Sequence, residues 1–451
     1  MKYLWFAAVL CVFCAGCGTV SSRIEREEAL KIYLQGLLYE GEGDFASAQE
    51  FYTRSLRIGG ASSHLSLKLG ETALKEKRYS DALQWFSKAY AENPDASAAF
   101  GMGLSHFFLK SNSEAMHFLS EGLSKQENIT YRAILSDLFI EAKQYNDAKK
   151  SYEILLEETR RRNFLILFNY GALLEKLKLD AEAEEAYRES LRLAPTFLRT
   201  YLSLASLSEK KGDRESAERY YLTALRINPK ERSLYGLLAW LYIQQKRLED
   251  GLAITKKGIA ETGESAELYA ISGLIYLEKE EYLSAREDLQ KAISLKEHAG
   301  SFFHLGIAYD KLGEPEESEQ CMRKAIELDP SYHPAMNYLG YTFLLANVHL
   351  QEAFSLIERA NILDPDNPAY LDSLGWAWFL KGDDRRAEHY LLKAVEKDRD
   401  PEIMEHLGHL YYRKKDMVKT VYWWAASLEL KKNPDLEKLL KTAQETMRMR
   451  K

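Results

Sequence analysis

Residues 368–401 have the sequence PAYLDSLGWAWFLKGDDRRAEHYLLKAVEKDRDP, and this stretch decides the fold of the chain. It contains two apolar patterns of helical period, separated by KGD at positions 381–383. Small residues stand where two antiparallel helices would touch, at Gly375, Ala387 and Ala394. A single unit of this kind cannot bury its own apolar faces, so it needs a copy of itself on each side.

The same spacing of small residues recurs through the chain. A first series advances by 33 to 35 residues and comprises Gly36, Gly70, Gly103, Ser136, Gly171, Ala205, Ala239, Gly273, Gly306, Gly340, Gly375 and Gly408. A second series follows twelve residues later and comprises Ala48, Ala82, Ala115, Ala148, Ala183, Ala217, Gly251, Ala285, Ser318, Ala353, Ala387 and Thr420. Only the step from Gly340 to Ala353 is thirteen residues, so the turn there carries an extra residue.

Small residues on two facing helices let the helix axes approach closely, and a bulky side chain then fills the space beside them. Such a side chain stands four residues beyond the second series in half of the repeats, at Tyr52, Phe86, Tyr152, Tyr187, Tyr221 and Trp424. We therefore expect twelve repeats, beginning near Ala29, Ser63, Ala96, Ile129, Phe164, Leu198, Arg232, Ala266, Ala299, His333, Pro368 and Pro401. The prolines agree, because each falls at the end of a repeat or opens a helix.

The pattern resembles the tetratricopeptide repeat. The residues that carry this resemblance are Phe302, Leu305, Gly306, Tyr309 and Pro330, whereas Ser318 and Met322 depart from the family signature. The resemblance implies an all-α solenoid, a right-handed superhelix of helix-turn-helix repeats. We expect one continuous array of about twelve repeats over residues 29–434, closed by a polar capping helix over 435–451. The segments NYLGYTFLL and YLDSLGWAWFLKGD also resemble a subset of these proteins common in Gram-negative bacteria.

The first residues, MKYLWFAAVLCVFCAGC, indicate export. The apolar run is shorter than the roughly 20 residues that span a bilayer, but it suits a signal peptide. Its end resembles the bacterial lipobox, although Cys14 stands where Leu is usual. We therefore predict a signal peptide over residues 1–16, lipidation (including palmitate-type acyl chains) of Cys17, and a lipidated N-terminus with a short tether over 17–28. Ordinary secretion with cleavage nearby is the alternative.

Composition argues against several classes of function. A net charge of -7 gives no basic face for nucleic acid. Phosphate-binding loops, nucleophile elbows and HExxH zinc motifs are absent from the sequence, so we expect neither an enzyme, a cofactor nor a small-molecule substrate. The pair His406 and His409, with Glu405 beside it, lacks further ligands at metal spacing, so we expect no metal. Cys321 lies alone in the body of the chain and is expected to be a buried thiol.

The resemblance implies that first helices line a concave groove that binds protein or peptide partners. The groove positions lie one and four residues after the first series of small residues, and three before it. The candidate groove residues are Trp240, Asn337, Tyr341, Asp372, Trp376, Phe379, Glu405, His409 and Tyr412, with Ile243 and Leu344 beside them. In residues 368–401 this register assigns Trp376 to binding and Trp378 to packing. The alternative is that these rings pack between neighbouring helices as core.

Together these features predict a non-catalytic interaction scaffold, anchored by lipid to the periplasmic face of a bacterial outer membrane. Its expected partners are proteins of envelope assembly, secretion, pilus formation or polysaccharide export. One alternative is a substrate-recruiting subunit of a transferase or cell-wall enzyme complex. Others are a soluble periplasmic or secreted protein, and a cytoplasmic regulator whose N-terminus only mimics a signal.

Overall fold

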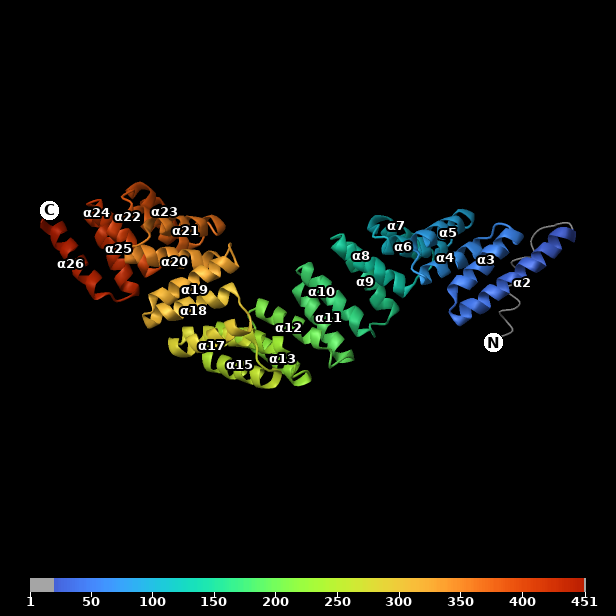
Figure 1. The fold of residues 1–451 in the computed structure, drawn as a ribbon, viewed down its shortest axis with the longest axis horizontal. Helices are drawn as coiled ribbons and strands as arrows, with labels where there is room; N and C mark the ends of the chain where they lie inside the picture. Colours follow the sequence, from blue (N-terminus) through green and yellow to red (C-terminus); the bar gives the residue numbers. More distant parts are fainter. Residues whose placement is uncertain (1–19, 450–451) are drawn as a thin grey trace. The chain divides into compact units, whose positions relative to one another are not determined.

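A computed structural model describes residues 20–449 of the chain, and those residues form 25 α-helices and no strand. The helix contacts divide the chain into two compact units, one ending at Ala217 and the other beginning at Glu218. Within each unit the helices follow one another in pairs joined by short turns (Figure 1). The signal-peptide and Cys17 predictions fall on residues outside the described range.

The first unit contains α2 (Val20–Glu42), α3 (Phe45–Gly59), α4 (Ser63–Lys75), α5 (Tyr79–Glu92), α6 (Ala96–Phe108), α7 (Asn112–Lys125), α8 (Ile129–Glu141), α9 (Tyr145–Glu158), α10 (Phe164–Lys176), α11 (Asp180–Leu193) and α12 (Leu198–Lys210). Helix α13 (Arg214–Ile227) includes the boundary. The second unit continues with α14 (Arg232–Gln244), α15 (Leu248–Thr262), α16 (Ala266–Glu278), α17 (Tyr282–Leu295), α18 (Ala299–Leu312), α19 (Pro315–Leu328), α20 (His333–Ala346), α21 (Leu350–Leu363), α22 (Pro368–Leu380), α23 (Asp384–Lys397), α24 (Pro401–Arg413), α25 (Met417–Leu430) and α26 (Pro434–Met449).

The all-α repeat architecture predicted from the sequence is confirmed. The first helices of eleven repeats, from α4 to α24, begin at the residue that the spacing predicts. Helix α2 is the exception, because it begins at Val20 and not near Ala29. The range predicted for the tether, 17–28, is therefore too long, because residues 20–28 already belong to this helix.

The small residues of the first series receive a side chain from the second helix of the same repeat. A methyl carbon added at Gly36 would lie 2.6 Å from the Tyr52 ring, and one at Gly375 would lie 2.8 Å from Leu391 Cγ. Any larger residue would therefore push the two helices apart. Four of the aromatic residues found by spacing are such covering side chains, namely Tyr52, Phe86, Tyr187 and Trp424, and Trp424 lies over Gly408 with no exposed surface.

Each turn between paired helices contains one residue in the left-handed conformation. These residues are Gly43, Lys77, Lys110, Lys143, Lys178, Gly212, Lys246, Glu280, Gly313, Asn347, Gly382 and Lys415. The longer turn between α20 and α21 contains a second one, His349, with φ of 47°. The extra residue predicted there is thus accommodated by a second left-handed residue, and the register of both helices is kept.

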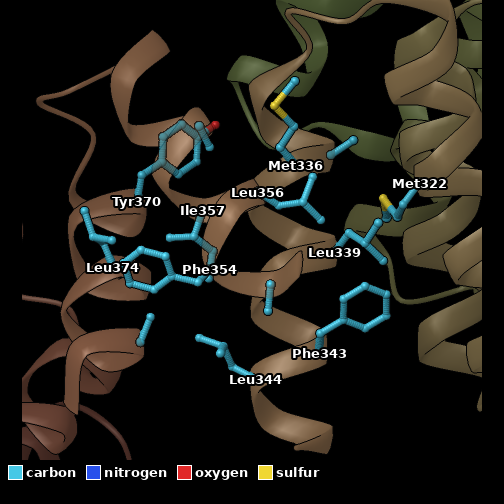
Figure 2. Packing of buried hydrophobic residues seen from close by; sticks show 14 of the residues in the cluster. Met322, Met336, Leu339, Phe343, Leu344, Phe354, Leu356, Ile357, Tyr370 and Leu374 are labelled. Carbon is cyan, nitrogen blue, oxygen red and sulfur yellow. The ribbon is translucent and has the colours of Figure 1, made fainter. Parts of the chain in front are cut away.

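Contacts within and between successive repeats form the core. Figure 2 shows Met322 of α19 near Leu339 of α20, and Leu374 of α22 near Phe354 and Ile357 of α21. Leu344, which the register placed beside the groove, is 5% exposed and belongs to this core, so that placement is wrong.

Helix α26 closes the last repeat. Leu436 and Ala443 on this helix are buried against Trp424, while most of its other side chains face solvent. One apolar stripe on an otherwise polar helix covers the last open face of the array. Across residues 20–449, no helix has both the length and the apolar character needed to cross a bilayer.

The substitution Gly408→Ala tests the close helix contact. The added carbon would collide with the Trp424 ring, so we expect it to destabilise the last repeat by about 1–3 kcal/mol. Gly41→Ala is the control, because an added carbon there meets nothing within 4 Å. Hydrogen exchange should accelerate in α24 to α26 of Gly408→Ala and remain unchanged in Gly41→Ala. Equal exchange in both variants would show that the small residue is not required.

Candidate functional site

The indole of Trp376 in α22 lies between two other rings. Phe379, one turn further along α22, is stacked at 4.6 Å between ring centres with an interplanar angle of 13°. His406 of α24 is stacked at 4.1 Å with an angle of 16°. Two parallel rings this close to one indole centre cannot lie side by side, so they cover its opposite faces.

Charged groups lie at both ends of this stack. His406 Nδ1 is 2.9 Å and 3.0 Å from the two carboxylate oxygens of Asp372, and both residues are only 6% exposed. At the other end the guanidinium carbon of Arg413 lies 3.5 Å from the Phe379 ring centre. Arg413 also forms an ion pair with Asp384. The stack therefore joins α22 to α24 through alternating rings and charges.

The buried carboxylate of Asp372 shifts the titration of His406. Burial alone would lower the pKa of the imidazole, but the charge of Asp372 and its hydrogen bond outweigh burial and raise this pKa above the ordinary value. The pair therefore favours the protonated form of His406.

A cavity of about 540 Å³, which we call the charged cavity, lies beside this stack. It is lined by Tyr341, Leu345, Trp376, Asp400, Pro401, Glu402, Glu405, His406, His409, Ser427, Lys431, Lys432, Asn433 and Pro434. The structure thus brings together four of the candidate groove residues, Tyr341, Trp376, Glu405 and His409. Since both faces of the indole are covered, Trp376 presents only its edge to the cavity.

The other candidates near the C-terminus lie elsewhere. Asp372 is buried in its pair with His406, so the prediction that it faces the groove is wrong. Phe379 lies between Trp376 and Arg413. Asn337 is half-buried, and its Oδ1 has no hydrogen-bond partner among the described residues. Tyr412 is 44% exposed beside the Trp424 ring and does not line the charged cavity.

Trp378, two residues from Trp376, packs as the register indicates. Its ring meets Phe354 edge to face at 4.6 Å, and the guanidinium carbon of Arg386 lies 3.3 Å from its centre. It adjoins the cores of two successive repeats. Trp378 therefore has the packing role that was expected for it.

A second cavity, of about 390 Å³, lies beside Trp240, and we call it the Trp240 cavity. Its lining is mostly apolar and comprises Trp240, Ala266, Glu267, Ala270, Ile271, Leu274, Lys296, His298, Gly300, Ser301, His304 and Tyr332. Burial lowers the pKa of His304 to about 4, so its imidazole is neutral at pH 7 and adds no charge.

Trp240 and Trp376 occupy equivalent positions of their repeats but have different surroundings. The positions of Phe379 and His406 are taken by Ile243 and Ile271, and the position of Asp372 is taken by Gly236. No flat ring therefore covers the indole of Trp240, which is 44% exposed and has no ring partner among the described residues. Of the two tryptophans, Trp240 is the one with an open face.

Comparison with known proteins identifies the repeat. Two family models, both described as tetratricopeptide repeat, match residues 33–97 and 135–196, and residues 198–231, 266–298 and 299–332, together about half of the chain. The chain belongs to the tetratricopeptide repeat family. The matched residues end at 332, so the charged cavity lies in tetratricopeptide-like repeats beyond them.

Two curated relatives and one solved structure show the range of similar proteins. The chain is 33% identical over 148 residues to the TPR repeat-containing protein PA4667 of Pseudomonas aeruginosa, covering 31% of this chain and 25% of the relative. It is 28% identical over 223 residues to the human protein O-mannosyl-transferase TMTC1, covering 48% and 25%. The chain thus spans a quarter of the length of each relative. The structure of the APC/C hetero-tetramer Cut9-Hcn1 is 13% identical with a TM-score of 0.49, covering 92% of this chain and 96% of that one.

Tetratricopeptide repeats are generally protein-interaction scaffolds, and their helices supply binding surfaces. Sequence reasoning found Trp240 and four residues of the charged cavity, but it missed the basic pair Lys431 and Lys432 and the neutral His304. Lys431 and Lys432 precede the capping helix and lie outside the repeat register that was used to find groove positions. Among the described residues, no three His, Cys, Asp or Glu side chains are grouped in a way that could hold a metal ion.

The pair of His406 and Asp372 predicts a pH-dependent stability. Because the folded-state pKa of His406 is raised above 6.5, its stabilising contribution is fully present below pH 6.5 and is lost as pH rises through the folded value. The free energy of unfolding should fall by about 1.4 kcal/mol for each unit by which the folded-state pKa of His406 exceeds its unfolded-state pKa. Urea unfolding from pH 6 to 9 should show this loss for the natural chain and not for Asp372→Asn/His406→Gln, which has no titrating pair. If the free energy of unfolding changes with pH in the same way for the two proteins, the prediction of a stabilising pair is contradicted.

Proposed function

We propose that the chain is a non-catalytic scaffold that binds an extended segment of a protein partner on the first helices of its second unit. The observation that carries this proposal is the Trp240 cavity, where an exposed indole stands beside an apolar hollow. An apolar side chain of the partner enters the cavity and packs against the open face of Trp240.

The energetics of the site favour such an occupant. Exposed tryptophans beside a concave apolar surface are typical anchors of protein interfaces, and they contribute about 2 kcal/mol or more when buried by a partner. The cavity volume suits one large side chain with part of its backbone. Glu267, Lys296 and Tyr332 at its lining provide polar groups that can bond the partner's main chain.

We further propose that Cys17 carries lipid and holds the repeats at the periplasmic face of the outer membrane. The support is the apolar run followed by Ala-Gly-Cys at positions 15–17. Helix α2 begins at Val20, three residues after Cys17, so an anchored chain would hold its first repeat within roughly 11 Å of the lipid. Several acyl chains on one cysteine would give stable attachment.

With the repeats at this membrane face, the proposed partners are proteins of envelope assembly, secretion, pilus formation or polysaccharide export. A recruiting subunit of a transferase complex is the alternative, and its support is the name of one relative, of which the chain spans a quarter. That alternative requires a catalytic partner chain and uses the same cavity.

Substitution of Trp240 tests the binding site. We expect Trp240→Ala to weaken binding by roughly 30-fold, because the main apolar contact is lost. Binding can be measured by calorimetry with peptides selected on the natural chain from a phage-displayed random dodecapeptide library. Leu237→Ala is the control, since Leu237 lies on the same helix, is 41% exposed and does not line the cavity. Equal affinities for the natural chain and Trp240→Ala, with helical content unchanged, would refute the site.

Substitution of Cys17 tests the anchor. Cys17→Ser expressed in a Gram-negative host should lose incorporation of labelled palmitate and move from the outer-membrane fraction to the soluble fraction. Cys321→Ser is the control, because Cys321 is buried in α19 and burial raises its thiol pKa to about 11. If Cys17→Ser still sediments with the outer membrane and is processed normally, the chain is not a lipoprotein of this kind.

A further inference from the structure

The charged cavity has two walls of opposite charge. The first turns of α24 and the residue before them provide Asp400, Glu402 and Glu405. The turn between α25 and α26 provides Lys431 and Lys432, both exposed. We call these the acidic wall and the basic rim.

The acidic wall is held in place by neighbouring groups. Tyr341 donates its hydroxyl hydrogen to Glu402 Oε1. Glu405 Oε1 lies 3.6 Å from His409 Nε2, and Glu405 Oε2 accepts a hydrogen bond of 3.3 Å from Asn433 Nδ2. These contacts orient the carboxylates toward the cavity, and the hydrogen bond and charge of His409 lower the pKa of Glu405, so it is ionised.

The basic rim does not neutralise this wall. Neither Lys431 nor Lys432 forms an ion pair within residues 20–449. Glu402 Oε2 likewise accepts no hydrogen bond within that range. His406, which also lines the cavity, is hydrogen-bonded to Asp372 and forms no ion pair with the acidic wall. Opposite charges therefore face one cavity without being paired to each other.

We infer that the charged cavity binds a dipolar segment of a protein partner. A lysine or arginine side chain of that segment contacts Glu402 and Glu405, and an acidic side chain near it contacts Lys431 and Lys432. This inference rests on the proposed function, in that the ligand is a peptide segment, but it concerns a different cavity from that of Trp240.

Charge complementarity selects this occupant over simpler ones. A ligand of a single sign would be attracted by one wall and repelled by the other, whereas a segment that carries both signs is attracted by both. The apolar parts of Leu345, Pro401 and Pro434, with the edge of Trp376, can pack on the methylene groups of a bound lysine or arginine. A volume of about 540 Å³ accommodates two side chains and the backbone between them.

The test distinguishes the contribution of the acidic wall to binding from that of the basic rim. A phage-displayed random dodecapeptide library is selected on the full chain carrying Trp240→Ala, so that peptides directed to the Trp240 cavity do not dominate. Selected peptides should be enriched in basic and acidic residues within one sequence. Adding Glu402→Gln should abolish only the basic enrichment, and adding Lys431→Met/Lys432→Met only the acidic one. Each change should weaken the parent-selected peptides about fivefold or more.

A matched control tests whether the enrichments arise from charges anywhere on the protein surface and not from those of the cavity. Glu429→Gln/Lys441→Met changes two exposed charges that do not line the cavity, and it should keep both enrichments. Loss of enrichment in this control, or unchanged selection by the cavity variants, would overturn the inference. The proposed function is judged separately, because it depends on the effect of Trp240→Ala on peptides selected with the natural chain.

Discussion

The contact on which the structure depends is the side chain that the second helix of each repeat places over a small residue of the first. At Gly375 this side chain is Leu391, and at Gly408 it is Trp424. At these glycines an added carbon would lie under 3 Å from the covering side chain, so the small residue allows the two helices to approach closely. The outer surfaces of the first helices can then vary freely, and binding features are built there.

In the C-terminal repeats, some of the side chains at these variable positions hold neighbouring first helices together. The stack of His406, Trp376, Phe379 and Arg413 joins α22 to α24, and Asp372 forms a buried hydrogen bond with His406. A row of rings at groove positions therefore packs between neighbouring repeats and holds them together. The cavity beside it is lined instead by charges from α24 and from the turn that precedes the capping helix.

The Trp240 cavity and the charged cavity, both in the second unit, differ in chemistry. The Trp240 cavity is mostly apolar, and the buried imidazole of His304 adds no charge to it. The charged cavity has carboxylates on one side and ammonium groups on the other. A partner chain that contacts both cavities would be recognised by apolar burial in the Trp240 cavity and by charge in the charged cavity. The arrangement of charges contributes more to specificity than to affinity.

The sequence by itself determined the repeat number, the starts of the first helices from α4 to α24 and the residues at the helix contacts, because period and small-residue spacing are local properties of the chain. It also identified Trp240 and Trp376 as equivalent positions. Only the tertiary structure decided that Trp376 is enclosed and Trp240 open, since the covering ring of His406 comes from the following repeat. Where that position is Ile271, the indole stays exposed. A ring's role is thus set by residues that pack against it from another helix, and the register of its own helix cannot reveal them.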